Sequence, residues 1–190
     1  MKRELLRKSI HLGTLAAPLL VWFLPRREGI VILGAAVLVA AAIEIARRRS
    51  RWFRLHFLKR SRSLLRGHER DGLAGATHLA IAYFFAFLLF PKPVAVLAML
   101  YGGAGDAVAA LVGKRWGRLR TSWGKSWEGA GAALVANVLM GLSIPGISIA
   151  PAIVGGIVAA GIEFLPIPVD DNLRVTLGGG AALWLAMAWL

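Results

Sequence analysis

Two acidic residues flank a basic, glycine-containing stretch between residues 102 and 132. Asp106 lies in an apolar segment rich in small residues, and Glu128 opens the next apolar segment. An ionisable group in such a segment is costly, so it usually faces a cavity or a charged partner. Carboxylates bind Mg²⁺, and basic side chains neutralise phosphate charge. The stretch therefore predicts a site for a metal ion and a polyphosphate. A structural ion pair with a nearby lysine or arginine is the alternative for Asp106.

Three glycines interrupt the basic loop between these carboxylates: Gly113, Gly117 and Gly124. Its basic residues are Lys114, Arg115, Arg118, Arg120 and Lys125. Glycine lets backbone amides turn toward an anion. Gly124-Lys125-Ser126 looks like the end of a P-loop, but that motif needs glycine at the position of Leu119 and a preceding strand. We therefore reject a P-loop fold. Ser126 and Glu128 stand where helix amides favour phosphate. A loop that only sets membrane orientation is the alternative.

A second polar cluster lies near the C-terminus. Asp170, Asp171 and Asn172 follow Pro166 and Pro168. Their oxygen atoms suit Mg²⁺ or sugar hydroxyls, whereas helix capping would explain only one of the three. Arg7, Lys8 and His11 could contact a nucleotide or a lipid headgroup, or could be a simple positive anchor. Further candidates for lining the same cavity are Glu44, Thr77, His78 and Glu163.

The composition predicts a membrane protein that positions these residues. The chain of 190 residues is 57% hydrophobic and 17% charged, whereas soluble domains carry about 25% charged residues. The apolar residues form long blocks, so we expect one all-α, polytopic membrane bundle over residues 1–190. The seven predicted spans are Ile10–Leu24, Gly29–Ala46, Leu73–Phe90, Pro93–Val112, Gly129–Ser143, Ile147–Leu165 and Leu173–Leu190. The first contains Pro18, which would kink it. No cysteine is present, which excludes disulfides.

The distribution of positive charge predicts the orientation of these spans. With the N-terminus in the cytosol and the C-terminus outside, 20 of the 23 Lys and Arg residues lie on the cytosolic side. This places the active face of a cytoplasmic-membrane protein toward the cytosol. Because the basic residues lie between spans, we expect anionic headgroups or a nucleotide, and not nucleic acid, to balance the net charge of +13. The sequence does not indicate an oligomeric state.

The longest polar connection, residues 47–71, combines arginines with apolar residues at helical spacing. Trp52, Leu55 and Leu58 illustrate the pattern. It predicts an amphipathic helix in the membrane interface. That helix could be a topology anchor, or a gate over which a lipid enters.

Several of these motifs together resemble the polyprenol kinase family, which includes dolichol kinase, phytol kinase and CTP-dependent diacylglycerol kinase. Asp106-x2-Ala109-x3-Gly113-x3-Gly117, followed by Gly124-Lys125-Ser126-x-Glu128-Gly129-x2-Ala132, is similar to its CTP-binding signature. Arg7-Lys8-x2-His11 and Glu163…Pro166…Asp170-Asp171-Asn172-Leu173 are similar too. Ala107 replaces a glycine of dolichol kinases, and the chain is much shorter than those enzymes. Both differences point to small phytol-kinase-like or prokaryotic members.

The resemblance implies a CTP- and Mg²⁺-dependent kinase that phosphorylates a membrane lipid alcohol: a polyprenol, phytol, geranylgeraniol or diacylglycerol. It implies that Lys125, Ser126 and the glycines hold the triphosphate, with Arg7, Lys8, His11 and Asn172 as further nucleotide contacts. Asp106 and Glu128 would bind Mg²⁺ or orient the hydroxyl, and Asp170 and Asp171 would complete the metal site. A cytidylyltransferase that makes a CDP-lipid and a non-enzymatic lipid or ion transporter are the alternatives.

Overall fold

A computed structural model of the chain describes residues 13–53, 55–56 and 72–190. The described residues form helices and no strand, with one isolated bridge between Arg120 and Ser126, which confirms the all-α prediction. The elements are α2 (Ala16–Phe23), α3 (Arg26–Arg49), α5 (Gly75–Leu89), α6 (Lys92–Leu100), the π-helical turn η2 (Tyr101–Gly105), α7 (Asp106–Arg115), α8 (Trp127–Ser143), α9 (Ile149–Phe164) and α10 (Asp171–Trp189).

Each predicted span overlaps one helical element, and α6, η2 and α7 run on as one helix of 24 residues. Two helices are long and apolar enough to cross a membrane: α3 and the continuous helix Lys92–Arg115. The helices α5 and α9 are apolar but shorter. Their length and composition support a membrane protein. The number of crossings and the orientation stay predictions.

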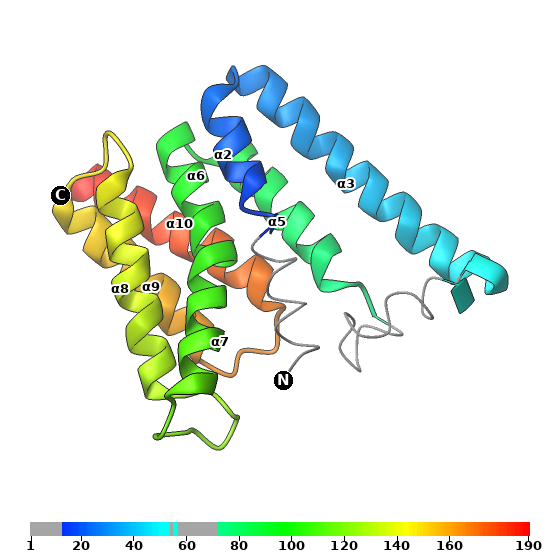
Figure 1. The fold of residues 1–190 in the computed structure, drawn as a ribbon. Coiled ribbons are helices and arrows are strands. Elements are labelled where there is room, and N and C mark those ends of the chain that lie inside the picture. Colours follow the sequence, from blue (N-terminus) through cyan, green and yellow to red (C-terminus); the bar gives the residue numbers. More distant parts are fainter. Residues whose placement is uncertain (1–12, 54, 57–71) are drawn as a thin grey trace.

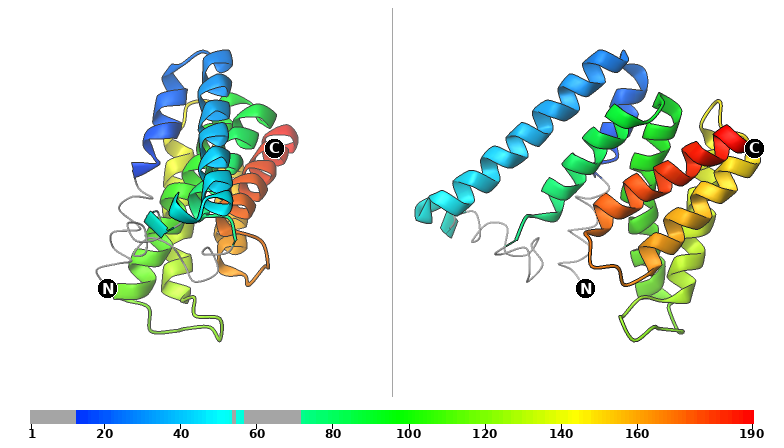
Figure 2. Two further views of the ribbon diagram at one scale, coloured as in Figure 1. Left: turned by 90° about the vertical axis from the view of Figure 1, so that its right-hand side faces the viewer. Right: turned by 180° about the vertical axis from the view of Figure 1, so that it is seen from behind.

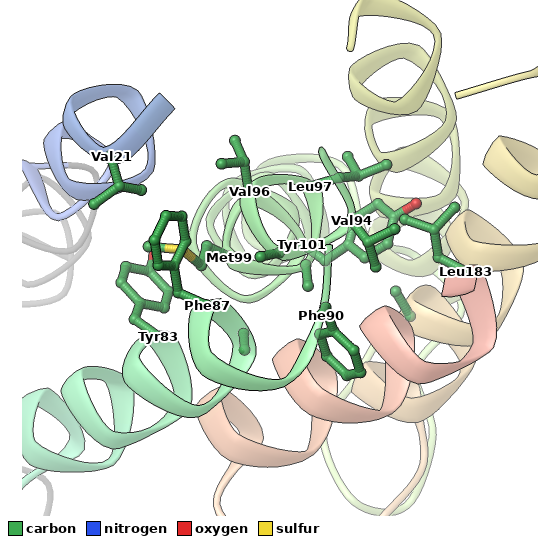
Figure 3. Close-up of a cluster of buried hydrophobic side chains, with 14 of the residues drawn as sticks. Val21, Tyr83, Phe87, Phe90, Val94, Val96, Leu97, Met99, Tyr101 and Leu183 are labelled. Atoms are coloured by element: carbon green, nitrogen blue, oxygen red, sulfur yellow. The ribbon is translucent and has the colours of Figure 1, made fainter. Parts of the chain in front are cut away.

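The continuous helix Lys92–Arg115 forms the centre of the bundle. Every residue from Val94 to Met99 is buried, as is Tyr101. Figure 3 shows Val94, Leu97 and Tyr101 surrounded by side chains from neighbouring helices, including Phe87 and Leu183. A helix that is apolar on all sides is buried against partners. This central helix carries Asp106 as the first residue after η2.

The helix α3 lies along one side of the bundle (Figures 1 and 2). Only 17% of its most apolar window is buried, so most of its apolar surface faces outward. One end is fixed by Arg26, whose guanidinium donates to the Phe90 carbonyl at 3.0 Å, and by Lys92, whose Nζ donates to the Leu24 carbonyl at 2.7 Å. These bonds satisfy carbonyls that a helix end leaves without partners.

The sequence predicts a kink from Pro18, and the structure interrupts the helix one turn before that residue. Proline cannot donate a backbone bond to the Thr14 carbonyl. The chain turns at Thr14 and Leu15, where the Ala17 amide donates to the Thr14 carbonyl at 3.0 Å, and α2 then begins at Ala16. Most of the predicted amphipathic segment 47–71 lies outside the described residues. Within it, residues 51–53 and 55–56 are helical, and Trp52 is exposed.

The two loops that carry the predicted site residues lie together at one end of the bundle. Figure 1 shows the α7–α8 loop and the α9–α10 connection at the same end, and the C-terminus at the other end. The two polar clusters found in the sequence therefore belong to one region of the molecule.

Candidate active site

The π-helical turn η2 brings two helices, α8 and α10, close to the segment before Asp106. A Cβ atom on Gly102 would lie 2.0 Å from the Thr176 Oγ1 of α10, and one on Gly105 would lie 2.4 Å from the Asn137 Oδ1 of α8. Only glycine permits contacts this close. Single π turns inside α-helices occur frequently at functional sites. Here the turn fixes the start of α7, and with it Asp106, against α8 and α10.

Four segments place charged side chains around Glu163. Asp106 is 8% exposed and Glu163 is 4% exposed. Lys125 Nζ forms an ion pair with Glu163 Oε1. Asp106 and Asp171 both lie close enough to interact electrostatically with Glu163. Three carboxylates and a lysine from α7, the α7–α8 loop, α9 and the start of α10 thus come together, so residues predicted separately from the sequence share one site.

This arrangement fits a metal that arrives with a nucleotide. Among the described residues, no group of three or more His, Cys, Asp or Glu side chains could hold a metal ion. Mg²⁺ usually keeps several waters and binds one or two carboxylates together with substrate phosphates. Asp106 and Asp171 could supply those carboxylates, and Lys125 could neutralise phosphate charge. The predicted Mg²⁺ stays a prediction.

The α7–α8 loop is held by its own hydrogen bonds. The Arg120 guanidinium donates to the Gly113 carbonyl at 2.8 Å. The Thr121 amide donates to the Lys125 carbonyl at 2.8 Å, and the Lys125 amide donates to Thr121 Oγ1 at 3.1 Å. Gly124 has a φ of +86°, a conformation that glycine adopts readily, and it closes the turn. These contacts fix the backbone of Lys125, whose side chain pairs with Glu163.

Trp123 of this loop and Trp127, the first residue of α8, contact the end of α9. Trp123 Nε1 donates to the Phe164 carbonyl at 2.9 Å. The Trp127 ring lies 4.6 Å from the Phe164 ring, centroid to centroid. Because Phe164 follows Glu163, these contacts set the position of the carboxylate that pairs with Lys125. The sequence analysis missed these anchors. Their signal was tryptophan in a basic loop beside an apolar segment, which is typical of a membrane interface.

Glu128 holds the loop backbone. Its Oε1 accepts hydrogen bonds from the amides of Arg118 at 2.8 Å and Leu119 at 3.0 Å. The Leu119 amide, the amide of Glu128 itself and the Arg118 amide lower the pKa of this carboxyl, which precedes the predicted span. Its Oε2 is shielded from solvent and lacks a hydrogen-bond partner among the described residues. One carboxylate oxygen is therefore structural, and a metal or catalytic role for the other stays a prediction.

The glycines around Ser126 allow α7, the loop and α8 to meet. Ser126 Oγ accepts a hydrogen bond from the Gly129 amide at 3.1 Å and caps α8. A Cβ atom on Gly117 would lie 2.1 Å from the Gly113 carbonyl oxygen and 2.7 Å from Ser126 Oγ. Close packing therefore explains Gly113 and Gly117, where the sequence suggested amides turned toward an anion. Nucleotide contacts by these residues stay a prediction.

The acidic run at the start of α10 divides into two roles. Asp170 caps the helix, because its Oδ1 accepts from the Asn172 amide at 3.0 Å, and its Oδ2 lies 3.4 Å from His78 Nδ1. Asn172 Nδ2 donates to the Gly75 carbonyl at 3.2 Å and so joins α10 to α5. The carboxylate of Asp171 interacts electrostatically with that of Glu163. A cavity of about 410 Å³ with polar and apolar walls lies beside this helix start, lined by His78, Asp170, Asp171 and Arg174 and by Ile167, Pro168 and Val169.

Two other predicted residues join helices. The buried Glu44 pairs with Arg47, whose Nε donates to its Oε2 at 3.0 Å. Glu44 Oε1 accepts from the Ala74 amide at 2.8 Å and from Thr77 Oγ1 at 3.3 Å. Glu44 and Thr77 thus attach α3 to the start of α5. The predicted nucleotide contacts Arg7, Lys8 and His11 lie outside the described residues.

Comparison with known proteins gives two relatives that match over most of their length. Phytol kinase of Synechocystis sp. is 31% identical over 200 aligned positions, which cover 98% of this chain and 82% of the relative. An uncharacterized protein of Rickettsia prowazekii is 24% identical over 181 positions, which cover 90% of this chain and 88% of the relative. No family model and no solved structure matches the chain.

Proposed function

The chain belongs to the polyprenol kinase family as a phytol-kinase-like member, and we propose that it transfers the γ-phosphoryl group of CTP to a membrane lipid alcohol with Mg²⁺. The observation that carries the lipid alcohol kinase activity is the 31% identity with phytol kinase over 98% of the chain. CTP as the donor is supported by the likeness of the segment from Asp106 to Ala132 to a CTP-binding signature. Polyprenol, phytol, geranylgeraniol and diacylglycerol are the candidate acceptors.

Lys125 is the residue that we assign to the triphosphate. Its Nζ pairs with Glu163, and its side chain is 32% exposed, so it can reach an incoming anion. A triphosphate competes with Glu163 for this lysine, because phosphate oxygens carry more charge than one carboxylate. The fixed backbone of the loop keeps Lys125 at the site during this exchange.

Asp106 is the residue that we assign to the acceptor alcohol. Phosphoryl transfer depends mainly on positioning and on charge neutralisation. Asp106 orients the hydroxyl and accepts its proton as the alcohol oxygen bonds to the γ-phosphorus. The bond between the γ-phosphorus and the bridging oxygen breaks, and CDP leaves. When bound with the nucleotide, Mg²⁺ would supply further neutralisation of phosphate charge. Asp171 would help to hold that ion.

The site faces the cytosol in this proposal, where CTP is present. Seven crossings with a cytosolic N-terminus put the α7–α8 loop and the α9–α10 connection on the cytosolic side. The positive charge of that side attracts anionic headgroups. The lipid hydroxyl then lies at headgroup depth beside Asp106.

The test uses purified protein, Mg²⁺ and γ-labelled CTP or ATP with a panel of lipid alcohols. We expect label in the lipid with CTP and release of CDP. Label transferred equally well from ATP would contradict the choice of nucleotide. Release of pyrophosphate from CTP when a lipid phosphate is supplied as the acceptor, with no labelled lipid alcohol, would replace the kinase with a cytidylyltransferase.

A further inference from the structure

An apolar groove of about 770 Å³ lies between α2, α3 and α5. Leu19 lines it from α2, Ala36 from α3 and Ala80 from α5. Among the described residues that line it, only Thr14 and Tyr83 carry polar side-chain atoms. Sites for small ligands typically measure about 300 to 1,000 Å³ and combine apolar walls with a few polar groups. The groove therefore has the size and chemistry to hold one amphiphilic molecule.

The polar end of the groove lies next to the helix of the active site. Tyr83 is 3% exposed, and its shielded hydroxyl lies near Thr14 but has no hydrogen-bond partner among the described residues. A Cβ atom on Gly103 would lie 2.7 Å from that hydroxyl oxygen. Gly103 belongs to η2 and stands three residues before Asp106, about 5 Å along a helix. Thr14 and Tyr83 thus mark the part of the groove that lies beside the helix carrying Asp106, the residue that we assign to the acceptor alcohol.

The other end of the groove continues into the apolar outer surface. Leu19 is 59% exposed and Phe23 is 81% exposed at the edge of the groove. They adjoin α3, whose apolar outer face can contact membrane hydrocarbon. An aqueous ligand would find no polar surface at this opening. A molecule with a long hydrocarbon chain could enter from the bilayer without crossing water.

We propose that this groove holds the hydrocarbon chain of a single-chain lipid alcohol, with the hydroxyl at Thr14 and Tyr83, directed to Asp106. The inference rests on the proposed function and adds the place of the acceptor. A volume of about 770 Å³ with almost wholly apolar walls suits one linear prenyl or alkyl chain. The order of polar and apolar groups along the groove matches that of the alcohol.

The first test fills the groove with a large side chain. Ala36→Trp places an indole in the groove, whereas Ala35→Trp places it on the neighbouring exposed position of α3, which does not line the groove. For Ala36→Trp we expect the KM for geranylgeraniol to rise about tenfold or more, because apolar contact with the chain is lost. The KM for CTP should not change in either variant. Equal KM values for geranylgeraniol in the two variants would overturn the assignment of this groove to the lipid acceptor.

The second test reads binding without catalysis. A geranylgeraniol analogue with a diazirine at its far end is irradiated with the full-length protein in nanodiscs. We expect labelled peptides from α2, α3 and α5, and competition by excess phytol. Labelling elsewhere, or competition by phospholipid equal to that by phytol, would overturn the inference. Labelling in the groove of a protein that phosphorylates no alcohol would reject the proposed function and leave the groove as an alcohol-binding site.

Discussion

At the scale of single residues, the buried carboxylate of Asp106 is the centre of the proposed chemistry. Asp106→Asn keeps the shape of the side chain and removes its charge. We expect kcat to fall by about 10² to 10⁴, the usual contribution of a positioned acid or base, with little change in melting temperature. Label transfer and thermal unfolding in detergent are measured on the same preparation.

The matched control for this variant is Glu28→Gln, at an exposed carboxylate near the start of α3. It should retain wild-type activity. An Asp106→Asn protein with near-wild-type kcat would remove Asp106 from the mechanism.

The Lys125–Glu163 ion pair links stability to nucleotide binding. Lys125→Ala leaves Glu163 buried without its partner, so we expect a loss of about 1 to 3 kcal/mol in the free energy of unfolding. Combining it with Glu163→Gln should recover much of that stability but not the affinity for CTP. Thermal unfolding with and without CTP separates the two effects. If the double variant binds CTP as tightly as the wild type, Lys125 does not hold the triphosphate.

The sequence indicated which residues could form a site, but not how they are arranged. The residue types of Asp106, Lys125 and Asp171 indicated a phosphate and metal site, and the structure brings these residues together around Glu163. Glu163 itself was predicted only as part of a cavity wall. Its pairing with Lys125 spans 38 residues of sequence, and no local pattern encodes such a contact.

At the scale of elements, Glu128 controls the order of the α7–α8 loop. Glu128→Gln weakens the acceptor of the Arg118 and Leu119 amides. We expect faster hydrogen exchange at these two amides, with unchanged exchange in α5. The pKa of Glu128 is lowered in the folded protein, so its charge stabilises the loop above the pKa of a free glutamate. That protection is lost as the pH falls through the lowered pKa. Equal exchange in variant and wild type at neutral pH would contradict this role.

The junction of α7, the loop and α8 should tolerate no Cβ atom at Gly117. Gly117→Ala would place a carbon 2.1 Å from the Gly113 carbonyl oxygen, so we expect a loss of about 1 to 3 kcal/mol in stability. Gly131→Ala is the matched control, because nothing lies within 4 Å of that position in α8. It should be neutral or slightly stabilising. Similar melting temperatures for the two variants would show that the junction accommodates a Cβ atom at Gly117 and would contradict this prediction.

The helices themselves could be predicted because long apolar segments in a sequence indicate helices of this kind directly. The predicted span Gly29–Ala46 became α3, and Pro93–Val112 became the central helix. The π-helical turn η2 could not be predicted, because its small residues are equally compatible with a regular α-helix. It arises from tertiary contacts, in which α8 and α10 approach Gly105 and Gly102.

At the scale of the whole molecule, the orientation in the membrane can be tested directly, since the chain has no cysteine. Ser122→Cys introduces a thiol in the α7–α8 loop, and Glu28→Cys introduces one at the start of α3. In intact cells, a membrane-impermeant maleimide should label only the cysteine at position 28. In inverted vesicles it should label only the one at position 122. The reverse pattern would place the active site outside.

One experiment on the intact protein tests the lipid acceptor and the nucleotide donor together. Wild-type and Asp106→Asn proteins in nanodiscs receive Mg²⁺, phytol and CTP labelled at either the α- or the γ-phosphorus. The account predicts that label from the γ-position alone appears in phytyl phosphate, and only with the wild-type protein. Label from the α-position in the lipid, or equal transfer by both proteins, would contradict it.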